Sequence, residues 1–351
     1  MDKSGKMTCA MIEAAVDKGL RDIEENPRRG IRNLVDLGTQ LSTSRFHKDF
    51  FRTSQQMLRN ENSPYYELTN HIVRNVNHQI IKHFGISLGY TSLTYGAQRI
   101  REYEKEYGYN IPWTIVFDFR EDTKNMLSDA EISEVLLYGE SIGIYCGMFF
   151  VNKNQAHLEN LVKMLASHKD SAFLVFTEPQ IITDVIADVI VESSNILVAL
   201  SSQTGGEKQS FMEAAQILFD KKCLYGAYCG YNDHNLQEVI GETYSRQIKE
   251  ARCTFTFLIR EEFNNAQNEK RFSHFMQATK SANKDPFFWI DFYEDLAHVD
   301  RTISVEDCFL AIQGDGQIAV KTLAALQEGI NIRTHSLQTI MEKTMPKNQF
   351  I

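Results

Sequence analysis

Short, almost continuously apolar runs alternate with amphipathic stretches from Thr114 to Ile259. Apolar runs of this length, with no polar face, are typical of strands covered on both sides in a parallel sheet. Because a helical stretch follows each run and crossovers between parallel strands are right-handed, the strands are expected to curl into an open or partial barrel. The pattern predicts six strands, at residues 114–118, 144–151, 172–177, 195–200, 224–229 and 253–259.

Helix signals lie between the predicted strands. Ser128 and Glu131 have the spacing of a capping box, and Gly143 follows the last turn of the helix that they begin. A second stretch, residues 234–251, carries apolar side chains at helical spacing and predicts one continuous helix.

The segments on either side of the strands differ from the barrel. Residues 8–108 are predicted to be entirely helical, with Gly108 ending the last helix. After residue 260 we expect a helix, a β-hairpin turning at residues 314–316 and a short terminal helix. The predicted organisation is a helical extension, a barrel and a C-terminal region, at residues 1–110, 111–262 and 263–351.

An aromatic run, DPFFWIDFYED, lies between the predicted barrel and the hairpin. Two interpretations remain open. The rings belong to the hydrophobic core, or they form an exposed strip that recognises a partner.

Composition limits the possible partners. A formal net charge of -9 and a pI near 5.6 give no basic field for gripping phosphates, so we expect no nucleic acid partner. The amino-terminal residues do not resemble a signal peptide, and no segment reaches about 18 consecutive apolar residues. The expectation is a cytoplasmic protein with no membrane partner.

The six cysteines, Cys9, Cys146, Cys223, Cys229, Cys253 and Cys308, have no pair separated by only two or three residues. This spacing does not favour a local metal site. In a reducing compartment they are expected to be small buried hydrophobic residues, although a site assembled from distant strands stays open.

Two motifs carry a family resemblance. YNIPWTIVFD, residues 109–118, leads into the first predicted strand, and CFLAIQGDGQIAV, residues 308–320, precedes a run ending GINIRTHSL. In this order the chain resembles radical SAM proteins that have a helical N-terminal extension and a C-terminal SPASM-like region. The resemblance implies an α/β fold: a partial (β/α)6 TIM-like barrel with a parallel sheet, an all-helical N-terminal extension and a small SPASM-like β-hairpin region.

The cofactor motifs of that family are missing. The family carries C-x3-C-x2-C after the first strand, whose thiolates hold a four-iron cluster that chelates S-adenosylmethionine (SAM). Here residues 119–126 read FREDTKNM, without cysteine. Residues 151–154 replace the family's Gly-Gly-Glu-Pro turn, and Val320-Lys321 replaces a Pro-Cys pair. We therefore expect no cofactor, because both the iron-sulfur cluster and the SAM site are predicted to be lost.

The carboxyl ends of the predicted strands meet at one end of the barrel, called here the barrel mouth, where such folds bind ligands. Either these side chains form a small-molecule or peptide pocket, with an arginine holding an anion, or they pair with one another and fill the mouth. The candidate pocket residues are Asp118, Arg120, Lys153, Glu178, Ser201, Asn232, His234 and Arg260.

Three functions follow from this reading. The leading hypothesis is a catalytically inactive member of the radical SAM superfamily that acts as a binding or regulatory subunit, for example beside an intact radical SAM enzyme. The second is an enzyme with non-radical acid-base chemistry at the barrel mouth, using Asp118, Glu178, Arg260 and His234. The third is a radical SAM enzyme with an atypical cluster.

Overall fold

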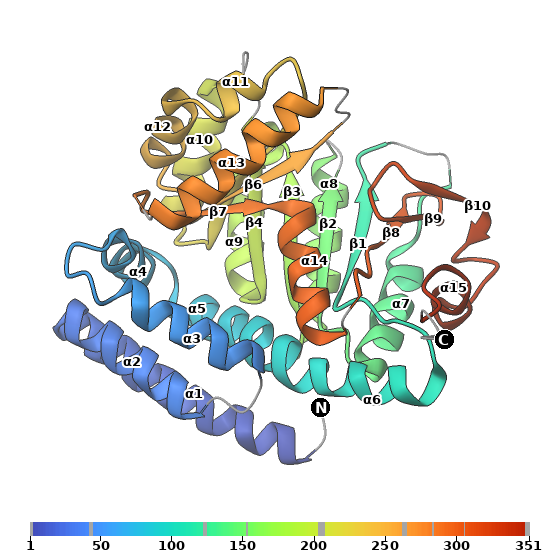
Figure 1. Cartoon of the computed structure of the whole chain (residues 1–351), viewed down its shortest axis with the longest axis horizontal. Helices are drawn as coiled ribbons and strands as arrows, with labels where there is room; N and C mark the ends of the chain where they lie inside the picture. The colour runs from blue at the N-terminus through green and yellow to red at the C-terminus, as the bar shows by residue number, and fades with distance from the viewer. Residues whose placement is uncertain are drawn as a thin grey trace.

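The structure, a computed structural model, describes residues 3–41, 45–121, 125–151, 154–202, 208–261, 265–282, 284–304 and 306–347. Lys153 of the candidate pocket lies outside these residues. One curved, ten-stranded sheet forms the centre, and helices cover its outer face and one of its ends (Figure 1). This confirms the predicted α/β partial barrel with a helical N-terminal region and a C-terminal hairpin.

Seven parallel strands follow one another in chain order across the sheet. The first six match the predicted runs within two residues at either end. Every residue of β1 to β4 is buried, as expected for strands covered on both faces. The strands are β1 (Thr114–Phe119), β2 (Cys146–Val151), β3 (Ala172–Thr177), β4 (Ile196–Ser201), β5 (Tyr225–Tyr231), β6 (Phe255–Arg260) and β7 (Phe288–Asp291).

The seventh strand, β7, was not predicted. It arises from the aromatic run and pairs in parallel with β6, with Phe257 opposite Ile290. At the other edge of the sheet the predicted hairpin extends β1. Its first strand is parallel to β1, with Val116 opposite Ala311, and the next two strands are antiparallel. These strands are β8 (Leu310–Gln313), β9 (Gln317–Val320) and β10 (Leu326–Asn331).

The crossover helices pack on the outer face of the sheet. The Ser128–Glu131 capping box is present, so the start of α7 was predicted correctly. The continuous helix predicted over residues 234–251 is wrong, because the chain breaks at Gly241, which caps a second helix. The crossover elements are α7 (Asp129–Ile142), α8 (Gln155–Leu165), η2 (Pro179–Ile181), α9 (Asp184–Ser193), α10 (Lys208–Asp220), α11 (Leu236–Val239) and α12 (Glu242–Glu250).

The N-terminal helices cover the amino ends of the strands (Figure 1). The His83 ring is 2.6 Å from the Lys169 carbonyl oxygen and 2.7 Å from the Ser194 hydroxyl oxygen, and these two residues lie shortly before β3 and β4. The carboxyl ends of the strands lie at the opposite end of the sheet. The helices are α1 (Lys3–Glu25), α2 (Pro27–Leu41), α3 (Arg45–Met57), α4 (Pro64–Asn75), α5 (His78–Ile86), the π-helix η1 (Ser87–Gly96) and α6 (Ala97–Tyr107).

A close contact between two glycines fixes this layer against the barrel. Gly96 ends η1 and Gly143 ends α7, and a Cβ atom on Gly96 would lie 2.3 Å from the carbonyl oxygen of Gly143. Gly143 also has a φ of 111°, which L side chains rarely adopt. A side chain at either position would force the two elements apart.

The remaining helices follow the barrel. Helix α14 runs across the inner, concave side of the sheet, between the β7 edge and the β1–β8 region (Figure 1). It therefore lies across the side opening that a partial barrel leaves. Among the described residues, no helix has the length and apolar character needed to cross a membrane. The three helices are α13 (Ala266–Ala282), α14 (Phe292–Ile303) and α15 (Leu337–Thr344).

Candidate functional site

Asp118 and Arg120 form an ion pair at the end of β1. Arg120 donates from Nε to Asp118 Oδ1 at 2.8 Å and from Nη2 to Asp118 Oδ2 at 2.5 Å. The guanidinium carbon also lies 5.0 Å from the centre of the Phe150 ring, within the range of a cation–π contact. Asp118 is only 7% exposed, so this bidentate pair compensates a buried carboxylate.

Glu178 and Ser201 meet around the Tyr228 ring. The Tyr228 hydroxyl donates to Glu178 Oε1 at 3.4 Å, and Ser201 is opposite Tyr228 in the sheet register. Burial, followed by the nearby Glu178 carboxylate, raises the pKa of the Tyr228 hydroxyl. The charges of Arg120 and Glu178 both act on this hydroxyl. The structure thus brings four predicted site residues, Asp118, Arg120, Glu178 and Ser201, into one group.

Aromatic side chains fill the barrel interior beside this group. Phe150 and Phe176 stack with ring centres 4.3 Å apart, and Tyr228 packs edge-on against both. Phe292, the first residue of α14, adds a second edge-on ring at 5.6 Å from Phe150 and 5.8 Å from Phe176. Phe292 is fully buried, so α14 closes the interior with an apolar side chain.

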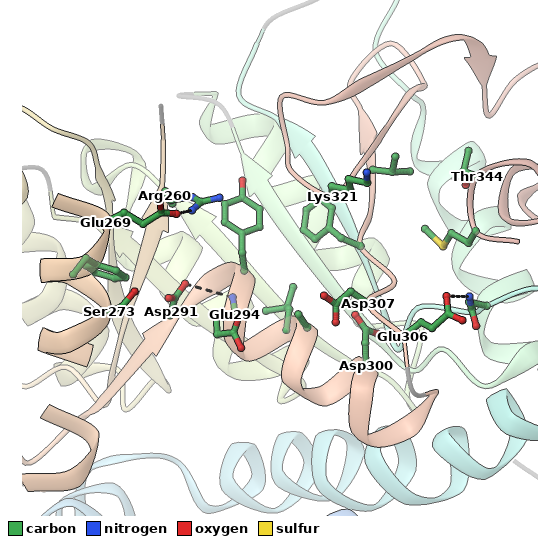
Figure 2. Close-up of a pocket in the computed structure, with 18 of the residues that line it drawn as sticks. Arg260, Glu269, Ser273, Asp291, Glu294, Asp300, Glu306, Asp307, Lys321 and Thr344 are labelled. Atoms are coloured by element: carbon green, nitrogen blue, oxygen red, sulfur yellow. Dashed lines mark hydrogen bonds and ion pairs between the residues drawn. The ribbon is translucent and has the colours of Figure 1, made fainter. Parts of the chain in front are cut away.

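A cavity of about 880 Å³ lies along α14 (Figure 2). Arg260, at the end of β6, lines it and donates to Glu269 Oε1 at 2.6 Å. Tyr293 also lines the cavity, and the positive charges of Arg120 and Arg260 both act to lower the pKa of its hydroxyl. The cavity therefore adjoins the Asp118 group. Burial raises the pKa of the Tyr293 hydroxyl.

None of the six carboxyl groups that line the cavity was predicted from the sequence, and two of them have strongly raised pKa values. Burial is the main cause that raises the pKa of Asp291 to about 6 and that of Asp300 to about 7. Asp291 ends β7 and caps α14, whereas Asp300 lies near the other end of that helix. Recognising the run ending at Ile290 as a strand would have placed Asp291 at a strand end, the same signal that selected Asp118.

The other predicted residues lie apart from the cavity. Asn232 donates to Glu261 Oε2 at 2.9 Å, and its own Oδ1 accepts the backbone amide of His234 at 2.9 Å. His234 is exposed and does not line the cavity. These residues form a turn after β5 that is separate from the Asp118 group.

Four of the six cysteines lie at or just before the amino ends of strands, away from the barrel mouth. Cys146 begins β2, whereas Cys223, Cys253 and Cys308 each lie two residues before a strand parallel to β1. Their thiols therefore lie toward the amino ends, opposite the end marked by Asp118. Burial raises the pKa of Cys146 and of Cys223 to about 12, which disfavours the thiolate that binds metal. Within the described residues, no cluster of three His, Cys, Asp or Glu side chains could hold a metal ion.

Comparisons with solved structures agree with the topology. The crystal structure of SuiB from Streptococcus suis bound to S-adenosylmethionine aligns with 70% of this chain at a TM-score of 0.52 and 12% identity, and just under two thirds of SuiB, 66%, is covered. A second crystal structure of SuiB aligns with 85% of this chain and 77% of its own, at a TM-score of 0.51 and 11% identity. At these identities the likeness shows the fold alone, and that fold is radical-SAM-like. No protein-family model and no curated protein matches the sequence.

Proposed function

We propose that this chain is a binding protein built on the radical-SAM-like fold, a pseudoenzyme that holds neither an iron-sulfur cluster nor SAM. One observation carries the proposal. At the end of β1, where the resemblance places the cluster loop, Arg120 folds back onto Asp118 and over Phe150. Arginine, aspartate and aromatic groups supply none of the thiolates that a four-iron cluster requires.

The position of the thiols supports the same proposal. Cys146 and Val151 are the two ends of β2, five residues apart, which is about 16 Å along a strand. A thiol at the first end cannot bond to a metal ion at the second without unfolding the strand. Cys229 lies further along β5, but its sulfur contacts the Gly230 carbonyl oxygen at 3.3 Å, and one thiol cannot hold a cluster.

Anaerobic reconstitution with iron and sulfide tests the proposal. We expect no stoichiometric iron and no charge-transfer absorption after gel filtration, and the same result for a Cys229→Ser variant. Stoichiometric iron that depends on any of the six cysteines would establish the atypical-cluster alternative and overturn the proposal.

A binding role also implies a ligand or a partner. We propose that the cavity along α14 is the place where a small molecule binds, and that an intact radical SAM enzyme is one candidate protein partner. A thermal-shift screen with a metabolite panel, and co-purification with a co-expressed radical SAM enzyme, test these two parts separately. No rise in melting temperature and no complex would count against a binding role.

Acid-base chemistry is the second candidate function. Asp291 favours it, because a carboxyl group with a pKa of about 6 beside a cavity can donate and accept protons near neutral pH. Arg260 lines the same cavity and could orient an anionic substrate. If an activity is detected, Asp291→Asn should abolish it, whereas His234→Ala should leave it unchanged because His234 does not line the cavity.

A further inference from the structure

The residues that line the cavity are spread along α14, with acidic groups at both ends (Figure 2). One end contains Asp291 and Glu269, and the other contains Asp300, Glu306 and Asp307. Asp291 and Asp300 are nine residues apart, about 13 Å along a helix axis at the usual rise. Two anionic regions are therefore separated by the length of an extended small molecule.

Negative charge dominates the lining. Six carboxylates line the cavity, against the two cations Arg260 and Lys321. Arg301 pairs with two of the carboxyl groups, Glu294 and Asp307, so the carboxyl groups outnumber the cations by three. Within the described part of the chain, the hydrogen bonds to the carboxylates of Asp291 and Asp300 come from backbone amides. A cationic ligand would supply the charge that these groups lack.

A buried acceptor at the second end points to a donor on the ligand. Asn110 is only 3% exposed and lines the cavity, and its Nδ2 donates to Glu306 Oε2 at 3.0 Å. Its Oδ1 has no hydrogen-bond partner among the described residues. A buried carbonyl oxygen without a donor is unfavourable, and an ammonium group has three donors to offer.

Aromatic rings line the stretch between the two ends. Tyr231 and Phe272 stack at 4.0 Å, and Tyr293 and Phe309 lie 5.5 Å apart. Such rings contact methylene groups and attract cations through their faces. They match a ligand whose charged groups are joined by an aliphatic chain.

We propose that this cavity binds an aliphatic polyamine, an elongated molecule with primary ammonium groups at its ends. One ammonium binds between Asp291 and the neighbouring acids, and the other binds beside Glu306 and donates to Asn110 Oδ1. This inference rests on the proposed role of the cavity as a ligand site and names the class of ligand, and it holds whether or not the barrel mouth carries a cofactor. An inorganic cation does not fit as well, because the described residues contain no metal-binding cluster and the lining is partly aromatic.

Isothermal titration of the full chain with spermine, spermidine and ethylenediamine tests the proposal. We expect spermine to bind at least about tenfold more tightly than ethylenediamine, since only a long molecule reaches both acidic ends. Asp291→Asn and Glu306→Gln should each weaken spermine binding about tenfold or more, which is the usual effect of losing a charge-assisted hydrogen bond. Asparagine still caps α14, so the first variant should fold normally.

Glu134→Gln is the matched control, because Glu134 is an exposed carboxylate on α7 outside the cavity. Its affinity for spermine should equal that of the wild type, and melting temperatures verify that all three variants fold. Three results would overturn the proposal. They are no binding of spermine, a loss of affinity in Glu134→Gln as large as in Asp291→Asn and Glu306→Gln, or displacement of spermine by magnesium ions that carry the same total charge. Tight binding of an oligolysine peptide without binding of spermine would assign the cavity to a basic peptide instead.

Discussion

Several polar side chains at the barrel mouth have partners within the protein itself. Arg120 pairs with Asp118, Arg260 pairs with Glu269, and Asn232 donates to Glu261. In each pair, a residue at the end of one strand contacts a residue near that end, in the helix that follows the strand, or in the loop after the next strand. A ligand that entered here would have to break or replace these contacts, whereas in the described part of the chain the hydrogen bonds to the carboxylates of Asp291 and Asp300 come from backbone amides.

Asp300 gives a prediction about pH. An aspartate in an unfolded chain ionises near pH 4, whereas burial, followed by the negative charges of Asp307 and Glu104, raises the pKa of folded Asp300 to about 7. The folded protein then holds an extra proton between these two values. The contribution of Asp300 to stability is therefore present at low pH and is lost as the pH rises from about 4 to about 7.

Asp300→Asn removes this titration while keeping an acceptor for the backbone amides of Trp113 and Cys308. The free energy of unfolding of the variant relative to the wild type should rise by on the order of 3 kcal/mol between pH 4 and pH 8. Urea denaturation at a series of pH values measures the difference. Parallel curves for the two proteins would show that folding does not raise the pKa of Asp300.

At the scale of elements, the sequence predicted what depends on local pattern. The runs of β1 to β6 and the capping box of α7 carry their own signals, so their positions were predicted within a few residues. The strand β7 has four residues, too few for periodicity to separate a strand from a helix, and it depends on pairing with β6. The break between α11 and α12 lies at Gly241, whose extended backbone the helical spacing did not indicate.

The placement of α14 leads to a prediction about Phe292. Its ring is fully buried against Phe150 and Phe176, so Phe292→Ala would leave a cavity in the barrel interior. We expect a loss of about 3 to 5 kcal/mol in the free energy of unfolding. Phe288→Ala is the control within the same aromatic run, because Phe288 is 36% exposed and should cost about 1 kcal/mol. Equal losses, measured by urea denaturation, would mean that Phe292 does not hold α14 in place.

The aromatic run DPFFWIDFYED contains both buried and partly exposed side chains. Phe287, Trp289 and Phe292 are buried and belong to the core, while Phe288 stacks on Tyr65 of α4 with a third of its surface exposed. Since strand alternation places neighbouring side chains on opposite faces, the run could not be assigned as a whole. Because the run was not recognised as a strand, Asp291 at its end was not predicted as a site residue.

At the scale of the whole molecule, the described hydrophobic side chains form two separate clusters. The large one joins the barrel, the hairpin and α5 to α6. The small one lies among α1, α2 and α4 and contains Ile23, Ile31 and Tyr66, with Ile81 packed against both clusters. The division into two clusters depends on which helices contact one another. Neither the net charge of -9 nor the family motifs carry that information.

Separate clusters predict separate opening of the two parts. Regions with fewer buried apolar contacts open at lower free energy than the core, so amides of α1 and α2 should exchange at a free energy at least about 2 kcal/mol below those of β3. Ile23→Ala, which truncates a side chain that is 1% exposed, should lower the opening free energy of α1 and α2 by a further 2 to 4 kcal/mol, roughly.

Native-state hydrogen exchange followed by mass spectrometry measures both quantities. In the Ile23→Ala variant the protection of β3 should not change, whereas Phe176→Ala should lower the protection of β3 because Phe176 is buried in the barrel interior. If Ile23→Ala lowered the protection of both parts equally, the helical layer and the barrel would form one cooperative unit. The contacts of His83 with Lys169 and Ser194 would then couple them more strongly than the division of their cores implies.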